Sequence, residues 1–143
     1  MTLNGTLAET IVSALSTDTQ FSDITFVVAY ENEIKPTPIE KPIVAISVKQ
    51  CEIGEKLQET LETGEITVTN KREMHTTLCA DIYLPYSMGG SAGHKIFDRI
   101  ATYLLFTKKH NISKSVCYNT DYDSNCEAII LRTHFIFNNT VSA

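Results

Sequence analysis

The chain has 143 residues, the size of a single domain that buries about two thirds of the surface its unfolded form exposes. It carries 12 Lys and Arg against 17 Asp and Glu, and the basic residues form no block, so a protein that grips nucleic-acid phosphates is disfavoured. No stretch reaches the roughly 18 apolar residues of a membrane helix. The start lacks the basic region of a secretory signal. We therefore expect one soluble domain over residues 1–143, made in a cytosol.

The N-terminal part predicts one helix followed by two strands. A capping-box spacing at Thr6, and apolar residues at helical spacing up to about Leu15, favour an amphipathic helix. Residues 24–30 and 43–48 are rich in β-branched and aromatic side chains, as strands are. The segment between them, 31–42, contains three prolines, which lack the N–H that a sheet ladder needs. We expect a loop or an extended arm there.

The middle of the chain predicts a polar insertion and then a β-hairpin. Residues 52–65 are charged enough to face solvent as a loop. Strands are expected over 65–69 and 73–84, with a turn at 70–72. Alternation in the second strand predicts one buried face, formed by Met74, Thr76, Leu78, Ala80, Ile82 and Leu84.

A glycine-rich turn, PYSMGGSAGHK at 85–95, precedes an apolar helical pattern. A phosphate-binding loop needs glycine directly before its lysine and a hydroxyl residue directly after it. His94 and Ile96 occupy these places, so the turn is expected to join a strand to a helix without binding phosphate. Ser91 is a suitable N-cap for this helix, which we expect to end near Lys108.

Two further strands are expected at 112–119 and 126–137, joined by an acidic turn at 120–125. Consecutive hairpins imply mainly antiparallel pairing. The predicted fold is therefore α+β, a mainly antiparallel sheet with two helices packed on one face. In the last strand the predicted core residues are Ile129, Leu131, Thr133, Phe135 and Phe137.

The acidic turn has carboxylates at the spacing of a calcium loop. Asp121, Asp123 and Asn125 fill the first, third and fifth places of an EF-hand loop. Cys126 and Arg132 stand where the loop needs glycine and glutamate. A plain turn is expected, because Asp and Asn are common in ordinary turns. The cysteines and histidines have no zinc spacing, so no metal and no cofactor are expected.

The cysteines are expected to be free thiols in a reducing compartment. Cys117 and Cys126 flank the last predicted hairpin, which leaves a disulfide as the minor alternative. Cys79, His75 and Asp81 share one face of a predicted strand, and nucleophilic catalysis uses these residue types. Any alternating strand places such a trio on its polar side, so no catalytic residue is assigned. A small enzyme or ligand-binding domain remains the alternative function.

The remaining features offer contacts to other proteins rather than a pocket. They are the proline-bearing arm at 31–42, the charged insertion at 52–65 and a group of residues at 83–88 that we expect to be exposed. Tyr and Met are enriched at protein interfaces. The candidate assembly contacts are Lys35, Pro36, Pro38, Glu55, Lys56, Glu62, Tyr83, Tyr86 and Met88.

A resemblance to a known family rests on two segments, KPIVAISVKQCEIGEKL and TGEITVTNKREMHTTLCADIYLPYSMGGSAGHKIFDRIATYLL. With the order of the elements, they resemble the tail terminator (tail completion) proteins of tailed bacteriophages and phage-tail-like particles. The resemblance covers residues 40–106. It is carried by a long strand ending in I-Y-x-P, the glycine-rich turn and a helix reading K-I-F-D-R-I.

The resemblance implies an α+β subunit that forms a ring, near six-fold, on the last ring of the tail tube protein and ends tail growth. It implies docking to neck or head-completion proteins and, in a contractile tail, to the last sheath ring. It implies no catalytic residue, no cofactor and no membrane partner. The protein would be assembled in the host cytoplasm and lie at the head-proximal end of the virion tail. DNA would only pass through the lumen, and an acidic subunit suits this because it repels phosphates. Another neck or tail-tube component is the alternative within this class.

Overall fold

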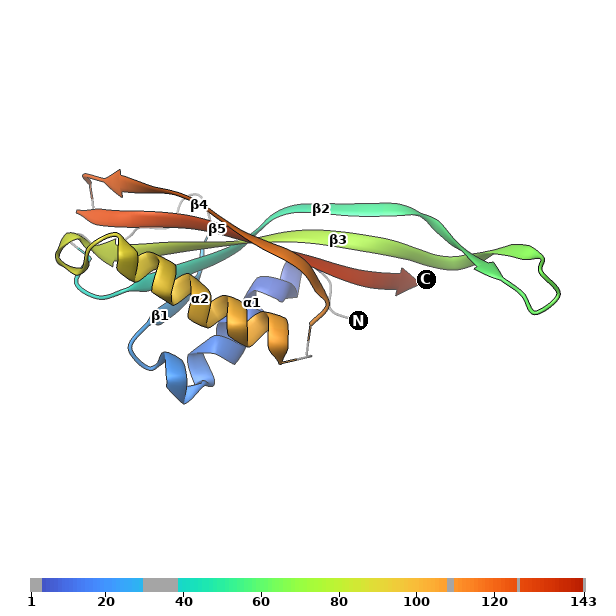
Figure 1. Cartoon of the computed structure of the whole chain (residues 1–143), viewed down its shortest axis with the longest axis horizontal. Helices are drawn as coiled ribbons and strands as arrows, with labels where there is room; N and C mark the ends of the chain where they lie inside the picture. The colour runs from blue at the N-terminus through green and yellow to red at the C-terminus, as the bar shows by residue number, and fades with distance from the viewer. Residues whose placement is uncertain (1–3, 30–38, 108–109, 126, 143) are drawn as a thin grey trace.

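The computed structural model describes residues 4–29, 39–107, 110–125 and 127–142. A five-stranded sheet carries two α-helices on one face (Figure 1), which confirms the expected α+β class. The elements in chain order are α1 (Asn4–Thr17), the 3-10 turn η1 (Thr19–Phe21), β1 (Thr25–Val28), β2 (Ile43–Thr60), β3 (Ile66–Pro85), the 3-10 turn η2 (Tyr86–Met88), α2 (Ser91–Phe106), β4 (Ile112–Asp123) and β5 (Ala128–Ser142).

The strands lie in the order β1-β2-β3-β5-β4. Only β1 and β2 are parallel, and the other three pairs are antiparallel. The short β1 pairs with β2 from Ile43 to Ile46. Beyond Ile46, within the described ranges, β2 pairs only with β3, and β4 pairs only with β5. Among the described residues, the sheet therefore has a long free edge on each side.

The core lies between the sheet and the two helices. All six alternating residues predicted for β3 are buried, and so are all five predicted for β5. Their apolar members, apart from Met74, share one core cluster with Ile11 and Leu15 of α1 and with Ile96, Ile100 and Leu104 of α2. The two-residue period of the strands thus locates the helix face of the sheet correctly.

Both helices begin differently from the sequence prediction. Thr6 lies inside α1, where its carbonyl accepts a hydrogen bond from Thr10 Oγ1 at 2.8 Å. Thr6 is therefore no cap, because a cap residue lies outside the helical backbone. Ser91 is the first residue of α2 rather than its cap, since Gly90 before it already has helical angles (φ −67°, ψ −31°). The helix ends at Phe106, two residues before the predicted end.

The loop predicted at 52–65 is wrong for 52–60 and right for 61–65, and the turn predicted at 70–72 is wrong. Strand β2 continues to Thr60, and β3 runs unbroken through 70–72. The actual turn is closed by the N–H of Leu61, which donates to the carbonyl of Glu65 at 2.8 Å. Charged side chains on both strands point to solvent. A polar sequence therefore predicts that a segment is exposed, but an exposed segment can still be a strand. The last hairpin also turns later than predicted, because β4 reaches Asp123.

The hairpin of β2 and β3 extends beyond the rest of the sheet (Figure 1). Within the described residues, β5 pairs with β3 only as far as Lys71, which lies opposite Ser142. Beyond Lys71 the hairpin is a two-stranded projection. We call residues 54–70 the hairpin arm; at its base Lys56 lies opposite Arg72, which still pairs with β5.

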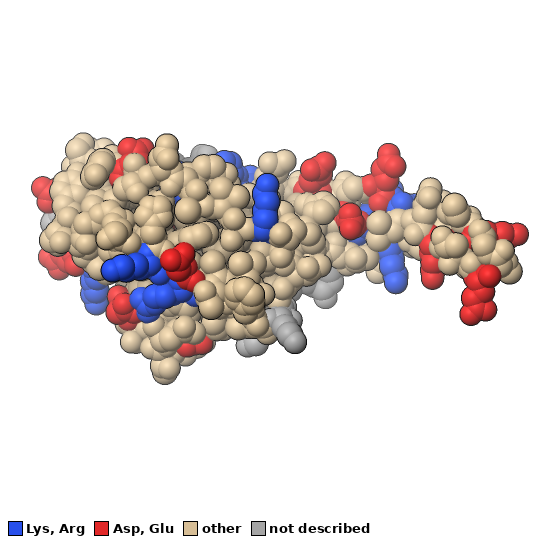
Figure 2. All heavy atoms as spheres, in the orientation of Figure 1, with Lys and Arg blue, Asp and Glu red and all other residues tan. Residues whose placement is uncertain are grey.

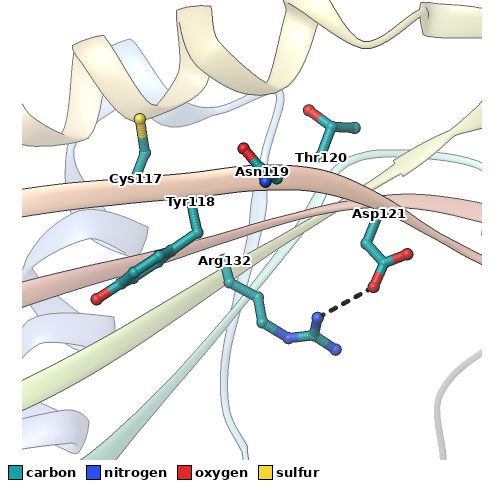
Figure 3. A pocket seen from close by; sticks show the side chains of 6 residues that line it. All are labelled: Cys117, Tyr118, Asn119, Thr120, Asp121 and Arg132. Atoms are coloured by element: carbon teal, nitrogen blue, oxygen red, sulfur yellow. Dashed lines mark hydrogen bonds and ion pairs between the residues drawn. The ribbon is translucent and has the colours of Figure 1, made fainter.

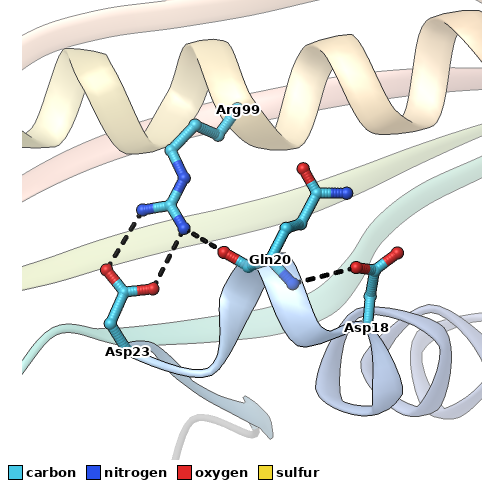
Figure 4. Close-up of polar contacts among 4 residues, drawn as sticks. All are labelled: Asp18, Gln20, Asp23 and Arg99. Carbon is cyan, nitrogen blue, oxygen red and sulfur yellow. Dashed lines mark hydrogen bonds and ion pairs between the residues drawn. The ribbon is translucent and has the colours of Figure 1, made fainter.

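Arg99 of α2 forms hydrogen bonds with the segment between α1 and β1 (Figure 4). Its guanidinium donates to both carboxylate oxygens of Asp23, at 3.0 and 3.2 Å, and to the backbone carbonyl of Gln20. It also lies 5.4 Å from the ring centre of Phe21. The hydrogen bonds from Arg99 hold the pKa of the Asp23 carboxyl below its ordinary range. The side chain of Asp18 accepts from the Gln20 N–H at 3.0 Å and shapes the same turn.

Neither helix of the described ranges is long and apolar enough to cross a membrane.

Candidate functional site

The three residues considered for catalysis share the face of the sheet opposite the helices, but they do not form one site. Cys79 and His75 lie four residues apart on β3, which is about 13 Å along a strand. His75 interacts instead with Asn138 Oδ1, 2.5 Å from its Nδ1, and with the Glu73 carboxylate at 3.4 Å. The strand register places His134 of β5 directly opposite Cys79.

Cys79 is not an activated nucleophile. Burial raises the pKa of its thiol, and the nearby Asp81 carboxylate raises this pKa further, against a smaller opposing effect of Lys49. A catalytic cysteine needs the opposite shift, because the thiolate is the reactive form. The Cys79 side chain is therefore held as a neutral thiol at neutral pH.

His134 is the neighbour of Cys79 that a single sequence could not assign. Its Nδ1 lies 3.0 Å from the hydroxyl of Tyr118 on β4, and the two ring centres are 4.8 Å apart. Burial lowers the pKa of His134, Lys49 lowers it further, and Asp81 acts in the opposite direction. The folded protein thus favours a neutral imidazole.

We expect the NMR titration midpoint of His134 to lie below its ordinary value of 6.5. Because the unfolded chain binds this proton more tightly, the stabilising contribution of His134 is present above about pH 6.5 and is lost as pH falls through the lowered pKa. Lys49→Gln should raise the midpoint, since it removes a positive charge near the imidazolium, and Asp81→Asn should lower it further.

The signal of His134 is assigned by its disappearance in His134→Gln. Lys95→Gln is the control, because Lys95 lies on α2, on the helix side of the sheet. A midpoint at or above 6.5, or equal shifts from the Lys49 and Lys95 variants, would contradict the packing described for His134.

A depression at the edge of the sheet is lined by Cys117, Tyr118, Asn119, Thr120, Asp121 and Arg132 (Figure 3). Cys117 and Thr120 point toward the α2 side, whereas Tyr118, Asp121 and Arg132 point to the opposite side. The depression therefore straddles strand β4 and does not enclose a ligand between converging side chains. Arg132 and Asp121 form an ion pair across it at 3.4 Å.

The acidic residues before β5 form local turn contacts. Asp121 Oδ1 accepts from the Tyr122 N–H at 2.8 Å, and Asp123 Oδ1 accepts from the Asn125 N–H at 2.9 Å. Among the residues that the structure describes, no three His, Cys, Asp or Glu side chains lie together as metal ligands do. Cys117 is a free thiol, and the alternative of its disulfide with Cys126 falls outside the described residues.

The glycine-rich turn has a geometric explanation. Gly89 has φ +78° and ψ 161°, a conformation that is essentially restricted to glycine. A Cβ atom on Gly93 would lie 3.2 Å from Leu84 Cδ1 and 3.4 Å from Leu131 Cβ, so glycine allows α2 to approach the sheet closely. Gly89 thus allows the chain to turn, and Gly93 allows α2 to pack closely on the sheet.

Tyr86 and Met88 at the start of this turn are exposed, and so is Tyr122 of β4; we call these three side chains the strand-end patch. The rings of Tyr86 and Tyr122 are 6.2 Å apart, and the Tyr86 hydroxyl donates to the Asp123 carbonyl at 3.4 Å. Tyr86 and Met88 are thus exposed as predicted.

The predicted exposure of Tyr83 and Pro85 is wrong. Tyr83 is only 6% exposed, because it packs in a second apolar cluster that contains Ile39, Ala45 and Ile130. Pro85 is buried at the end of β3. The strand is covered on both faces at this end, so Tyr83 is unavailable as a contact.

The hairpin arm is the other exposed surface. It carries the predicted contacts Glu55, Lys56 and Glu62, all of them exposed. Four glutamates and one lysine give residues 54–70 a net charge of −3, and acidic side chains surround the far end of the arm in Figure 2. Ile66 and Val68 are 66% and 60% exposed there, and Leu61 is also exposed. The predicted contacts Lys35, Pro36 and Pro38 lie outside the described residues.

The sequence matches no protein-family model, and the search of curated proteins gives no match. The candidate functional site is therefore defined by geometry alone. It consists of the hairpin arm, the strand-end patch and the two free edges of the sheet.

Proposed function

We propose that this chain is a tail terminator. Copies of it would cap the tail tube as a ring, end tail polymerisation and provide the docking surface for neck or head-completion proteins, and for the last sheath ring where the tail contracts. The resemblance of residues 40–106 supports this function. The observation that carries it is the pair of long free edges on opposite sides of one sheet, together with the hairpin arm beyond them.

The direction of the edge strands suits a ring. Strands β2, β3, β5 and β4 alternate in direction across the sheet, so β4 runs opposite to β2. When copies are related by rotation about an axis along the strands, β4 of one copy meets β2 of the next in antiparallel sense. Such a contact joins two different surfaces, as ring closure requires, and it would pair the part of β2 beyond Ile46 that β1 does not cover.

The charge of the chain is compatible with a conduit for DNA. Its formal net charge is −5, and like charge disfavours binding of the phosphates that would pass through the lumen. The raised pKa of Cys79 argues against the alternative of a thiol enzyme. We therefore propose a role in assembly alone.

The test is negative-stain electron microscopy of particles produced without this protein. Tails of irregular length that do not join heads are the expected result, and tails of normal length joined to heads would refute the role. Supplying the wild-type chain should restore uniform tails. Supplying Cys79→Ala should restore them equally, whereas an enzyme that used this thiol would give no restoration.

A further inference from the structure

We propose that the hairpin arm is the part of this subunit that binds the tail tube, and that it docks in an apolar groove with a basic rim on the tube subunit. This inference rests on the proposed function. In this proposal the arm binds a different protein, the tube subunit. The edges of the sheet remain available for contacts between copies of this chain.

The arm lacks the support that a hairpin needs in water. Two strands alone are marginally stable, and a third strand or a packed face is required for independent stability. Within the described residues, β5 gives this support only up to Lys71. A binding partner would supply the missing packing for the part beyond it.

One face of the arm carries two exposed apolar side chains and no charge at its outer paired positions. The register places Ile66 opposite Thr60 and Val68 opposite Gln58, so these four side chains share a face. The neighbouring pair, Glu59 and Thr67, points to the other face. Exposed β-branched side chains on one face and carboxylates around it suit an apolar groove with basic groups at its rim.

A second copy of this chain does not offer such a groove on its strand-end patch. Tyr86, Met88 and Tyr122 form the other group of exposed apolar side chains, but Asp123 and Glu127 follow Tyr122 closely in the chain. An arm with a net charge of −3 would meet like charge there, which is unfavourable. Charge complementarity therefore disfavours docking of the arm on the strand-end patch of another copy and favours a partner with basic groups around its apolar groove.

The experiment uses tail tubes assembled in cells that lack this protein, mixed with the purified full-length chain. End binding is counted by electron microscopy of labelled protein, and self-association is measured by analytical ultracentrifugation. The test variant is the double substitution Ile66→Thr and Val68→Thr, which keeps β-branched residues in the strand but removes the apolar surface. The matched control is Ile53→Thr, because Ile53 is 56% exposed on the same strand pair but lies outside the arm.

We expect the double variant to bind tube ends at least about tenfold more weakly than wild type, with unchanged self-association, and the Ile53 variant to bind normally. A second variant, Glu62→Lys with Glu65→Lys, should also weaken binding, and the difference from wild type should shrink in high salt. Circular dichroism and thermal unfolding check that each variant is folded.

The inference is overturned if wild type binds tube ends and the arm variants bind equally well. It is also overturned if the double variant loses self-association together with binding, because the arm then contacts another copy. If wild type itself fails to bind tube ends, the proposed function fails, and this outcome is distinct from the other two.

Discussion

Replacing Phe135 by alanine is expected to destabilise the protein by about 3–5 kcal/mol, because it removes a fully buried aromatic side chain and leaves a cavity. Phe135 is 0% exposed and lies in the middle of the sheet, opposite Leu78 on one side and Ser115 on the other. Its ring centre is 5.7 Å from that of Phe97, so it joins β5 to α2. Urea unfolding followed by circular dichroism measures the change in the free energy of unfolding.

Phe106→Ala is the matched control, since it removes the same atoms from a side chain that is 75% exposed at the end of α2. Its effect should stay within about 0.5 kcal/mol. Similar losses from the two substitutions would mean that Phe135 does not face the helices and that the helix face of the sheet is misassigned.

The sequence predicts Phe135 as a core residue because alternation and burial have the same cause. A strand that is buried on one face must place apolar side chains at every second position, and 128–137 and 74–84 do so. The helices were equally accessible to prediction, since Ile96, Ile100 and Leu104 recur at helical spacing. The α+β class follows from these local patterns.

The β2 half of the hairpin arm was missed because its periodicity is weak. Residues 54–60 have neither face buried within the described protein, so no alternation of apolar and polar residues marks them as a strand. A polar strand and a polar loop then look alike. The β3 half was predicted as a strand over 65–69, where Ile66 and Val68 alternate with threonines, and β3 confirms this.

Tyr83 shows a different failure. Runs of consecutive apolar residues at 43–46 and 128–131 indicate that both faces of the sheet are covered at this end. Tyr83 lies beside both runs, because its sheet partners are Ile43 and Ile130. This pairing depends on the register of the strands, and so does the pairing of Cys79 with His134. Such long-range strand pairings cannot be predicted from a single sequence.

The surface thus divides into regions with different requirements. The body needs tight packing to hold its two helices on the sheet, and its edge strands β2 and β4 are irregular in register and unpaired on their outer sides among the described residues. The arm has no such packing, and its exposed apolar face gains stability only from a partner. In an assembly subunit this separation lets substitutions in the arm alter binding while the body remains folded.

Replacing Gly93 by leucine is expected to destabilise the protein by about 3 kcal/mol, the upper part of the range for overpacking a well-packed site. Even a single Cβ atom there would lie 3.2 Å from Leu84 and 3.4 Å from Leu131, which belong to β3 and β5. A leucine would have to push α2 away from the sheet. Thermal and urea unfolding measure the loss.

Gly90→Leu is the control, three residues earlier in the same turn. A Cβ atom at Gly90 would have its nearest neighbour, Thr120 Cγ2, at 3.9 Å, and the backbone there is already helical, so the cost should stay below about 1 kcal/mol. Equal stability of the two variants would show that α2 does not approach the sheet at Gly93. Gly89 would keep its own explanation, because its φ of +78° and ψ of 161° favour glycine whatever the packing at Gly93. Close packing of α2 on the sheet predicts a large loss for Gly93→Leu and a small one for Gly90→Leu.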